Sequence, residues 1–227
     1  MTPSAEQNKR TITMSAVGIG LATGAYGLSF GAISIASGLT PVQTSVLSLL
    51  MFTGASQFAL VGVLGAGGGA IAAILTAWLL GARNGLYALH VAPMLSLRGV
   101  RRLTAAQVTI DESTAMAVAA EPHLPSSRHA FWATGIAVYV LWNIGTLLGA
   151  LGASALGDPA RLGLDAAIPA GFLALLWPRL RDRSAWAVAC GGAVIALALM
   201  PVTRPGVPVL ASALVAVTVG YRMRAKA

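Results

Sequence analysis

The chain has 227 residues, of which 56% are hydrophobic and 10% charged, and its mean hydropathy is +0.77. A soluble domain carries about 25% charged residues, and the stretch from Thr11 to Ala82 contains no acidic, basic or histidine residue. That stretch is more than three times the roughly 20 residues needed to cross a bilayer once. The composition excludes a soluble enzyme, and the recurrence of apolar segments to the C-terminus excludes a signal peptide with a secreted domain.

The net charge of +8 is spread over short basic groups that separate apolar segments. A nucleic-acid-binding protein would gather its cations on a solvated face beside stacking aromatic residues. Basic groups that punctuate apolar runs are instead typical of cytoplasmic loops in membrane proteins. We therefore expect a lipid bilayer, and no nucleic acid, around this chain. The basic groups lie at residues 9–10, 98–102, 128, 179–183 and 222–226.

In chain order, the pattern predicts a tail over residues 1–12, seven apolar segments and a basic tail over 223–227. Continuous apolar blocks favour helices over the alternating strands of a membrane barrel. We predict a single domain over residues 1–227 with an all-α, polytopic fold whose helices are broken by Gly and Pro. The apolar segments lie near residues 13–37, 43–64, 69–95, 130–156, 163–178, 184–201 and 206–222.

Residues 96–129 form a polar connection that contains one apolar piece at 105–120. This piece is short for a membrane span and is expected to be either an interfacial helix or a re-entrant element. A diverged inverted repeat would leave no visible trace in such a sequence, and none is evident.

The orientation of the first three segments has two solutions. If the later basic groups are cytoplasmic and the first three segments all cross, Lys9 and Arg10 lie outside, against the positive-inside rule. Alternatively, one of the first three segments enters the bilayer and returns on the same side. The sequence leaves both solutions open.

Glycine is concentrated in the first segment, where Gly24 and Gly27 flank Tyr26. Small residues at this spacing let two helix backbones approach closely. The functional alternative is a helix break at residues 24–27, in which Tyr26 and Gly27 help to bind a substrate through freed backbone groups.

The second segment carries Gly54, Ser56 and Gln57 at a depth where an unpaired amide costs several kcal/mol. Gln57 must therefore have a partner. That partner is either a neighbouring helix or a polar ligand bound where the helix is interrupted, as in transporters with discontinuous helices.

Arg83 lies within the third segment, followed by Asn84 and, one helical turn later, Tyr87. A charge at mid-membrane costs about 2.5–3.5 kcal/mol on insertion scales. On a single helix, Arg83, Tyr87 and His90 share one face, an arrangement suited to a cavity wall, and Asn84 is a further substrate-binding candidate. Alternatively, Arg83 extends along its helix to the membrane surface.

Acidic residues in the later part of the chain have two interpretations. Asp111 and Glu112, and Asp165 before Pro169, are candidates for coupling or gating a transport cycle. They are equally well explained as first-turn residues that interact favourably with a helix dipole.

No spacing of His, Cys or carboxylate residues suggests a metal site, and no Walker-type loop suggests ATP binding. The single cysteine, Cys190, lies in an apolar run and is expected to pack structurally. We therefore expect no catalytic residues, metal or cofactor.

Four motifs together resemble the AzlC family of branched-chain amino-acid permeases, over nearly the whole chain. The most specific motif is Gly54–Phe58 within residues 52–58; the others span residues 83–87, 110–113 and 165–172. The resemblance implies a bacterial inner-membrane, multi-pass exporter of valine, leucine, isoleucine and in some cases methionine. It also implies a small four-span AzlD-like partner subunit and an amino-acid substrate. Family members often have histidine after the arginine, where this chain has Asn84.

The resemblance implies transport, and the proton gradient is the expected energy source because no nucleotide site is recognisable. A zwitterionic substrate needs a carboxylate site, for which Arg83 or exposed backbone amides at Gly27 or Gly54 are candidates. It also needs an ammonium site, for which backbone carbonyls, Gln57 or Asp111 are candidates. The alternatives are a transporter of another small solute, a passive channel and a non-transporting assembly subunit.

Overall fold

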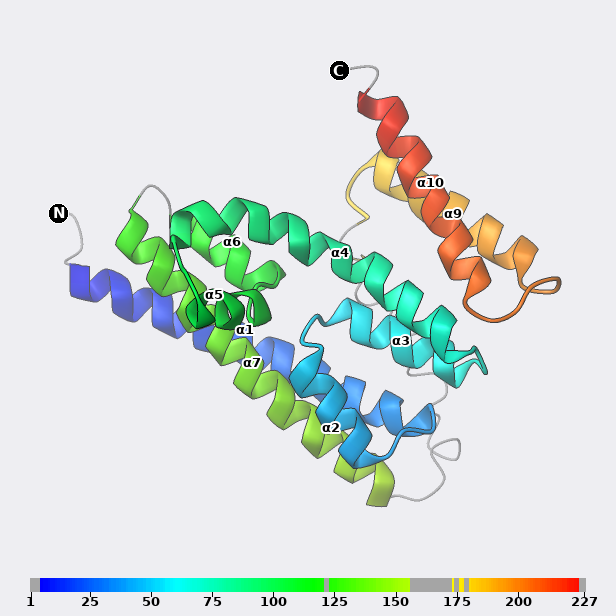
Figure 1. The fold of residues 1–227 in the computed structure, drawn as a ribbon, viewed down its shortest axis with the longest axis horizontal. Helices are drawn as coiled ribbons and strands as arrows, with labels where there is room; N and C mark the ends of the chain where they lie inside the picture. Colours follow the sequence, from blue (N-terminus) through cyan, green and yellow to red (C-terminus); the bar gives the residue numbers. More distant parts are fainter. Residues whose placement is uncertain (1–4, 121–122, 156–172, 174–175, 178–179, 225–227) are drawn as a thin grey trace.

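The computed structural model describes residues 5–120, 123–155, 173, 176–177 and 180–224, and within these ranges all regular structure is helical (Figure 1). By length and composition, two stretches are suited to crossing a membrane: Asn8–Ala36 and Leu124–Ala155. The helices are α1 (Ala5–Ala36), α2 (Pro41–Leu50), α3 (Ala55–Gly65), α4 (Ala70–Leu95), α5 (Val100–Gln107), α6 (Asp111–Ala119), α7 (Leu124–Ala155), α9 (Arg183–Leu199) and α10 (Val207–Arg224).

Several helices begin or end elsewhere than the predicted segments do. Helix α1 begins at Ala5, so most of the expected tail over residues 1–12 is helical, and α7 begins at Leu124, inside the expected polar connection. The apolar piece at 105–120 is two helices, because the chain leaves helical geometry between Gln107 and Asp111. The alternative of a helix break at residues 24–27 is wrong, since α1 is continuous there.

Helices α1 and α7 pack side by side in parallel and make the most extensive helix–helix contact of the described chain (Figure 1). Asn8 contacts Ser126 near their starts, whereas Gly31 packs against Thr146 and Ala150 near their ends. Glycines on both helices make this possible: a methyl group at Gly27 would lie 2.6 Å from the carbonyl oxygen of Trp142. The glycine pattern of the first segment therefore serves close helix packing.

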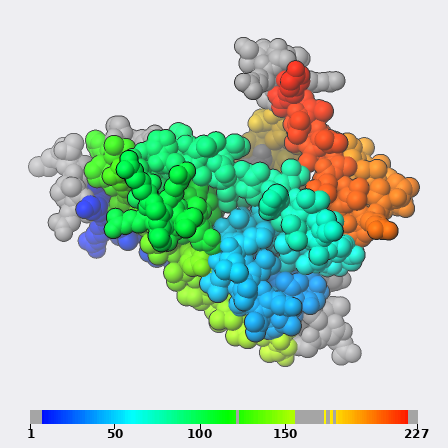
Figure 2. All heavy atoms as spheres, viewed as in Figure 1, coloured from blue at the N-terminus to red at the C-terminus, as the bar shows by residue number. Residues whose placement is uncertain are grey.

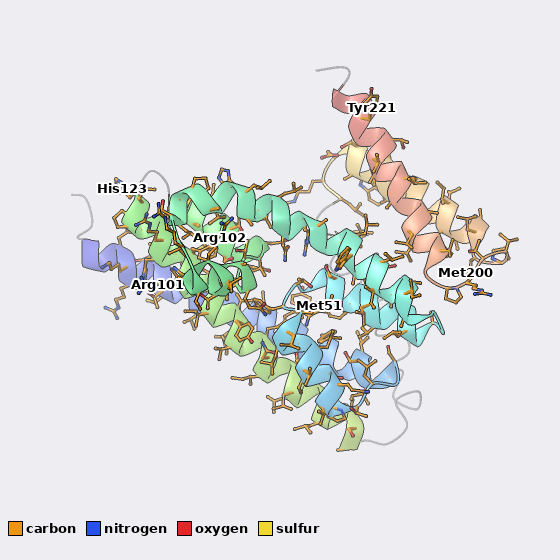
Figure 3. The ribbon with its side chains drawn as sticks, in the orientation of Figure 1. Met51, Arg101, Arg102, His123, Met200 and Tyr221 are labelled. Carbon is orange, nitrogen blue, oxygen red and sulfur yellow. The ribbon has the colours of Figure 1, made fainter. Side chains whose placement is uncertain are left out.

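Helices α2 and α3 form a hairpin that returns to the end of the molecule where it began. Helix α2 starts immediately after the C-terminal end of α1, with the Thr40 side chain capping its first turn. Helix α3 ends beside the same point, because a Cβ at Gly65 would lie 3.1 Å from Cβ of Ser37. The connection at residues 51–54 thus lies at mid-molecule, and Figure 3 shows Met51 there.

Helices α5 and α6 form a second hairpin, which enters from the opposite end. It follows the C-terminal end of α4, and the carbonyl of Ala117 near the end of α6 accepts a hydrogen bond from Ser127 at the start of α7. The start of α7 also meets the end of α4, where Nε of Arg128 donates to the Met94 carbonyl at 3.0 Å. Both ends of this hairpin therefore lie at that end of the molecule.

The two hairpins meet tip to tip. Nε2 of Gln107, the last residue of α5, donates to the Leu49 carbonyl at the end of α2 at 2.9 Å. The Tyr139 hydroxyl at the middle of α7 donates to the same carbonyl at 3.1 Å. Helices α1–α3 and α4–α6 are thus two units of the same plan, a long helix followed by a half-length hairpin, running in opposite directions.

A cluster of buried aromatic and aliphatic side chains holds the first hairpin against α1 and α7. Phe30 stacks on Trp142 with ring centroids 6.0 Å apart, and Phe58 meets Phe30 edge-on at 5.5 Å. Ile110, just before α6, belongs to the same cluster, so both hairpin tips are anchored in one core.

Helices α9 and α10 form an antiparallel pair that projects from the body of the molecule (Figures 1 and 2). Its turn contacts the body: a Cβ at Gly206 would lie 2.7 Å from Cβ of Ala72 in α4. Cys190 is exposed on α9.

Candidate functional site

Arg83, at the middle of α4, lies where the two hairpin tips meet. Its Nη1 donates to Oδ2 of Asp111 at 2.9 Å, and its Nη2 lies 3.4 Å from the carbonyl oxygen of Thr53. Asp111 opens α6, and Thr53 precedes α3 by two residues. A single guanidinium therefore contacts both hairpins.

The backbone before α3 explains why the chain breaks at this point. Gly54 has φ 62° and ψ −98°, a conformation that glycine adopts readily and other residues rarely do. Oε1 of Gln57 accepts a hydrogen bond from the Gly54 amide at 3.1 Å, which caps the start of the helix. The side-chain oxygen of Gln57 thus finds its partner in the backbone of its own helical turn.

The start of α6 is capped in the same way. The Ser113 hydroxyl oxygen accepts a hydrogen bond from the Ile110 amide at 3.1 Å, three residues earlier, just as Gln57 does for Gly54. The remaining first-turn amides of a helix have no intrahelical acceptor, and they form the positive end of the helix dipole. Arg83 contacts the N-terminal end of α6 directly, through Asp111. It also contacts the Thr53 carbonyl, two residues before the N-terminal end of α3.

Buried polar atoms without a partner gather around this junction. Gln57 is 0% exposed, yet its Nε2 has no hydrogen-bond acceptor among the described residues. The same holds, within the described part of the chain, for Oγ of Ser56, Oγ1 of Thr53 and Oδ1 of Asn84. Ser56 faces α4, because a Cβ at Gly81 would lie 3.3 Å from its hydroxyl oxygen.

The charged edge of the junction is partly exposed. The side chains of Arg83 and Asp111 are 25% and 26% exposed. Tyr87, one turn further along α4, is half-buried, as is Glu112 next to Asp111. The site thus combines an accessible ion pair with buried donors and acceptors.

Most, but not all, of the predicted site residues are brought together. Gly54, Ser56, Gln57, Arg83 and Asp111 lie at the junction, and Asp111 and Glu112 occupy the first turn of α6 as expected. The structure shows that α4 is unbroken through Asn84 and Tyr87.

Four predicted residues are not placed at the junction. Gly27 packs against Trp142 of α7, and Tyr26 is 43% exposed on the same continuous helix. Neither supplies the helix break on which its predicted role depended. Asp165 and Pro169 lie outside the described residues.

The sequence analysis missed three contributors. The Thr53 carbonyl is a backbone group with no side-chain signature, and Tyr139 is one aromatic residue in a long apolar helix. Gln107 was recognisable in principle, as an amide one residue before the β-branched run Val108–Ile110 that favours leaving helical geometry. Among the described residues, no group of three or more His, Cys, Asp or Glu side chains is arranged to hold a metal ion.

Comparison with known proteins agrees with these motifs. The family model described as "AzlC protein" matches residues 18–156, from within α1 through the end of α7. An "Uncharacterized membrane protein" of Archaeoglobus fulgidus is 33% identical over 190 residues, covering 82% of each chain. The "Inner membrane protein YgaZ" of Escherichia coli is 29% identical over 192 residues, covering 80% of this chain and 76% of its own. No solved structure matches. The chain belongs to the AzlC family of membrane proteins.

Proposed function

We propose that this protein transports branched-chain amino acids, valine, leucine and isoleucine and also methionine, across the bacterial inner membrane as an exporter driven by the proton gradient. The observation that carries the proposal is the junction of two opposed hairpins at Arg83. Half-helix ends that meet at mid-depth are the usual construction of substrate sites in secondary transporters.

The chemistry of the junction suits an amino acid. Nε2 of Gln57, the Ser56 hydroxyl and the open amides at the start of α3 are donors for a carboxylate. Asp111 is an acceptor for an ammonium group. Phe52 and Phe58, on either side of the α3 start, belong to an apolar cluster against which a branched side chain can pack.

We propose that both hairpins are re-entrant and that α1, α4, α7, α9 and α10 cross the membrane. The charge distribution supports this topology. The start of α1, the end of α4 and the start of α7 gather at one end of the molecule, near Lys9, Arg10 and Arg128. Arg101 and Arg102 follow at the same end (Figure 3). If α2–α3 returns to its own side, Lys9 and Arg10 join the other basic groups in the cytoplasm, as the positive-inside rule requires.

A small AzlD-like membrane subunit is the proposed partner, on the strength of the family resemblance. The two hairpins supply the moving parts of an alternating-access cycle, one facing each side of the membrane. Such a cycle needs a site reachable from either side in turn, and the tip-to-tip contact lies midway between the two entrances.

The test is efflux of labelled leucine and valine from vesicles that contain the protein and its partner. Gln57→Ala should lower the efflux rate about tenfold or more, because a buried donor that contacts the substrate is lost. Gln43→Ala is the matched control. Gln43 caps α2 through the Thr40 amide just as Gln57 caps α3 through Gly54, but it is exposed and remote from the junction.

Equal effects of the two substitutions would mean that Gln57 only caps its helix, and would contradict the proposed site. Efflux that persists as a conductance without saturation would identify a passive channel instead. Unchanged rates for Gln57→Ala in protein that inserts normally would favour an assembly subunit.

A further inference from the structure

The Arg83–Asp111 pair is poorly explained as a structural salt bridge. Each side chain is about one quarter exposed, at 25% and 26%, so the pair is neither fully solvated nor sealed in the core. A salt bridge in a low-dielectric region recovers little more than the cost of removing its charges from water. Its retention at the meeting point of two hairpins therefore suggests that the charges serve another partner.

The surroundings divide this junction into two poles. On the Arg83 side lie the Thr53 carbonyl and the start of α3, with two donors that have no partner in the described part of the chain, Nε2 of Gln57 and Oγ of Ser56. On the other side, Asp111 projects from the first turn of α6. The pole at α3 is rich in donors and positive charge, and the pole at α6 carries the carboxylate.

An α-amino acid carries its ammonium and carboxylate on one carbon atom, so a site for it must offer both charges within a small volume. We propose that Arg83 and Asp111 are the two poles of a zwitterion subsite, and that their ion pair is exchanged for two ion pairs with the substrate. The carboxylate binds Arg83 together with Gln57 Nε2, and the ammonium binds Asp111. This inference rests on the proposed function and specifies the recognition of its substrate.

The exchange keeps the charge balance of the site. In the empty state each charge satisfies the other at 2.9 Å, and in the occupied state each is satisfied by the ligand. An amine or a carboxylic acid alone would break the Arg83–Asp111 pair while supplying an opposite charge to only one of the two side chains, which is unfavourable in this partly buried site. The subsite therefore rejects both kinds of singly charged analogue while it accepts the zwitterion.

The test compares three probes that share one side chain: leucine, 3-methylbutylamine and 4-methylpentanoate. Their binding to the full-length protein in lipid nanodiscs is measured by calorimetry at neutral pH. The wild type should bind leucine at least about tenfold more tightly than either analogue. Arg83→Gln should shift the preference toward the amine, and Asp111→Asn toward the acid. Arg128→Gln, which removes a cation that contacts only the Met94 carbonyl in the described chain, should leave the preference unchanged.

A double exchange, Arg83→Asp with Asp111→Arg, keeps the test decisive if a single variant unfolds. A purely structural pair would regain both stability and leucine affinity. We expect the melting temperature to recover while leucine affinity stays about tenfold or more below that of the wild type. The reason is that the arginine that binds the substrate carboxylate is then on α6, away from Gln57. Wild-type leucine affinity in the exchanged protein, or an unchanged order of preference in both single variants, would overturn the subsite.

The same probes separate this inference from the proposed function. If the wild type prefers alanine or serine to leucine, but still rejects their amine and acid analogues, the branched-chain specificity is wrong and the subsite stands. If the wild type binds leucine and the variants keep its order of preference, the function stands and the subsite is wrong.

Discussion

Unpaired buried atoms differ in how much they reveal about function. The hydroxyls of Thr44, Thr76 and Thr134 are buried without a partner among the described residues, but a helical hydroxyl can rotate toward the carbonyl one turn earlier. The amide of Gln57 has no such freedom, because its oxygen is already fixed on the Gly54 amide. Leaving Nε2 unpaired costs about 1–3 kcal/mol, so this atom is the clearest indication of a ligand.

The pH dependence of stability should include a contribution from Asp182. It precedes α9, and its carboxylate accepts hydrogen bonds from the Ser184 hydroxyl at 2.6 Å and the Ala185 amide at 2.7 Å. These bonds, led by that of Ser184, lower the pKa of Asp182 below its ordinary value of 3.8. The stabilisation is therefore present above that value and is lost as the pH falls through the lowered pKa.

The check is the thermal stability of the detergent-solubilised protein between neutral pH and about pH 3. Asp182→Asn retains a good N-cap and should flatten the part of the acid dependence that comes from this site. Asp182→Ala should lower stability at neutral pH as well. An acid dependence identical in Asp182→Asn and the wild type would show that the lowered pKa has no bearing on stability.

At the scale of helices, the parallel pair α1–α7 depends on glycine only where the two backbones touch. A Cβ at Gly31 would lie 2.6 Å from the Ala150 amide nitrogen and would overlap the Thr146 carbonyl oxygen. A Cβ at Gly18, on the same helix, meets nothing within 4 Å. Glycine is therefore required at Gly31 but not at Gly18, between three and four turns away on the same helix.

Gly31→Ala should destabilise the protein by about 1–3 kcal/mol, because the helices must move apart. Gly18→Ala should be neutral or stabilising by up to about 1 kcal/mol, because alanine favours the helix more than glycine does. Melting temperatures of the two variants in one detergent provide the comparison. Equal effects would contradict the close contact of α1 with α7.

The sequence predicted the helical fold, the membrane environment and the interruption at Gly54, because each depends on local composition. It did not distinguish a crossing segment from a hairpin at residues 43–64, since an apolar run has the same hydropathy whether or not it turns back. The break before α6 has no Gly or Pro to mark it, and only the run Val108–Ile110 hints at it. The glycines of α1 were ambiguous, because only contact with α7 separates close packing from a broken helix.

Candidate site residues were predictable where the chemistry was rare for a membrane interior, as with Gln57, Arg83 and Asp111. Their meeting was not predictable, because Arg83 and Asp111 are brought together by the opposed directions of two hairpins. The contribution of Thr53 is a backbone carbonyl and follows from the path of the chain alone.

At the scale of the whole molecule, the account depends on two opposed hairpins that meet around Arg83. Both ends of the α2–α3 hairpin lie beside the C-terminal end of α1, and the turn between α9 and α10 contacts the start of α4 at that end. In the described chain, Arg204 in that turn is a basic residue at this end, whereas Lys9, Arg101 and Arg128 lie at the other. In the proposed topology, the positive-inside rule then places the α5–α6 hairpin on the cytoplasmic side.

The most direct test is the side from which single cysteines react with a membrane-impermeant thiol reagent. Cys190 is the one cysteine of the sequence, so Cys190→Ala provides the background. Val42, which is 72% exposed near the start of α2, and Ala66, exposed just after α3, are each replaced by cysteine. Lys9→Cys and Arg101→Cys report on the other end, and permeabilised membranes show that every cysteine can react.

The account predicts that Val42→Cys and Ala66→Cys are both labelled from outside the cell, and that Lys9→Cys and Arg101→Cys are both labelled from the cytoplasm. Labelling of Val42→Cys and Ala66→Cys from opposite sides would mean that α2 and α3 together cross the membrane. That result would contradict the junction of two re-entrant hairpins on which the proposed transport site rests.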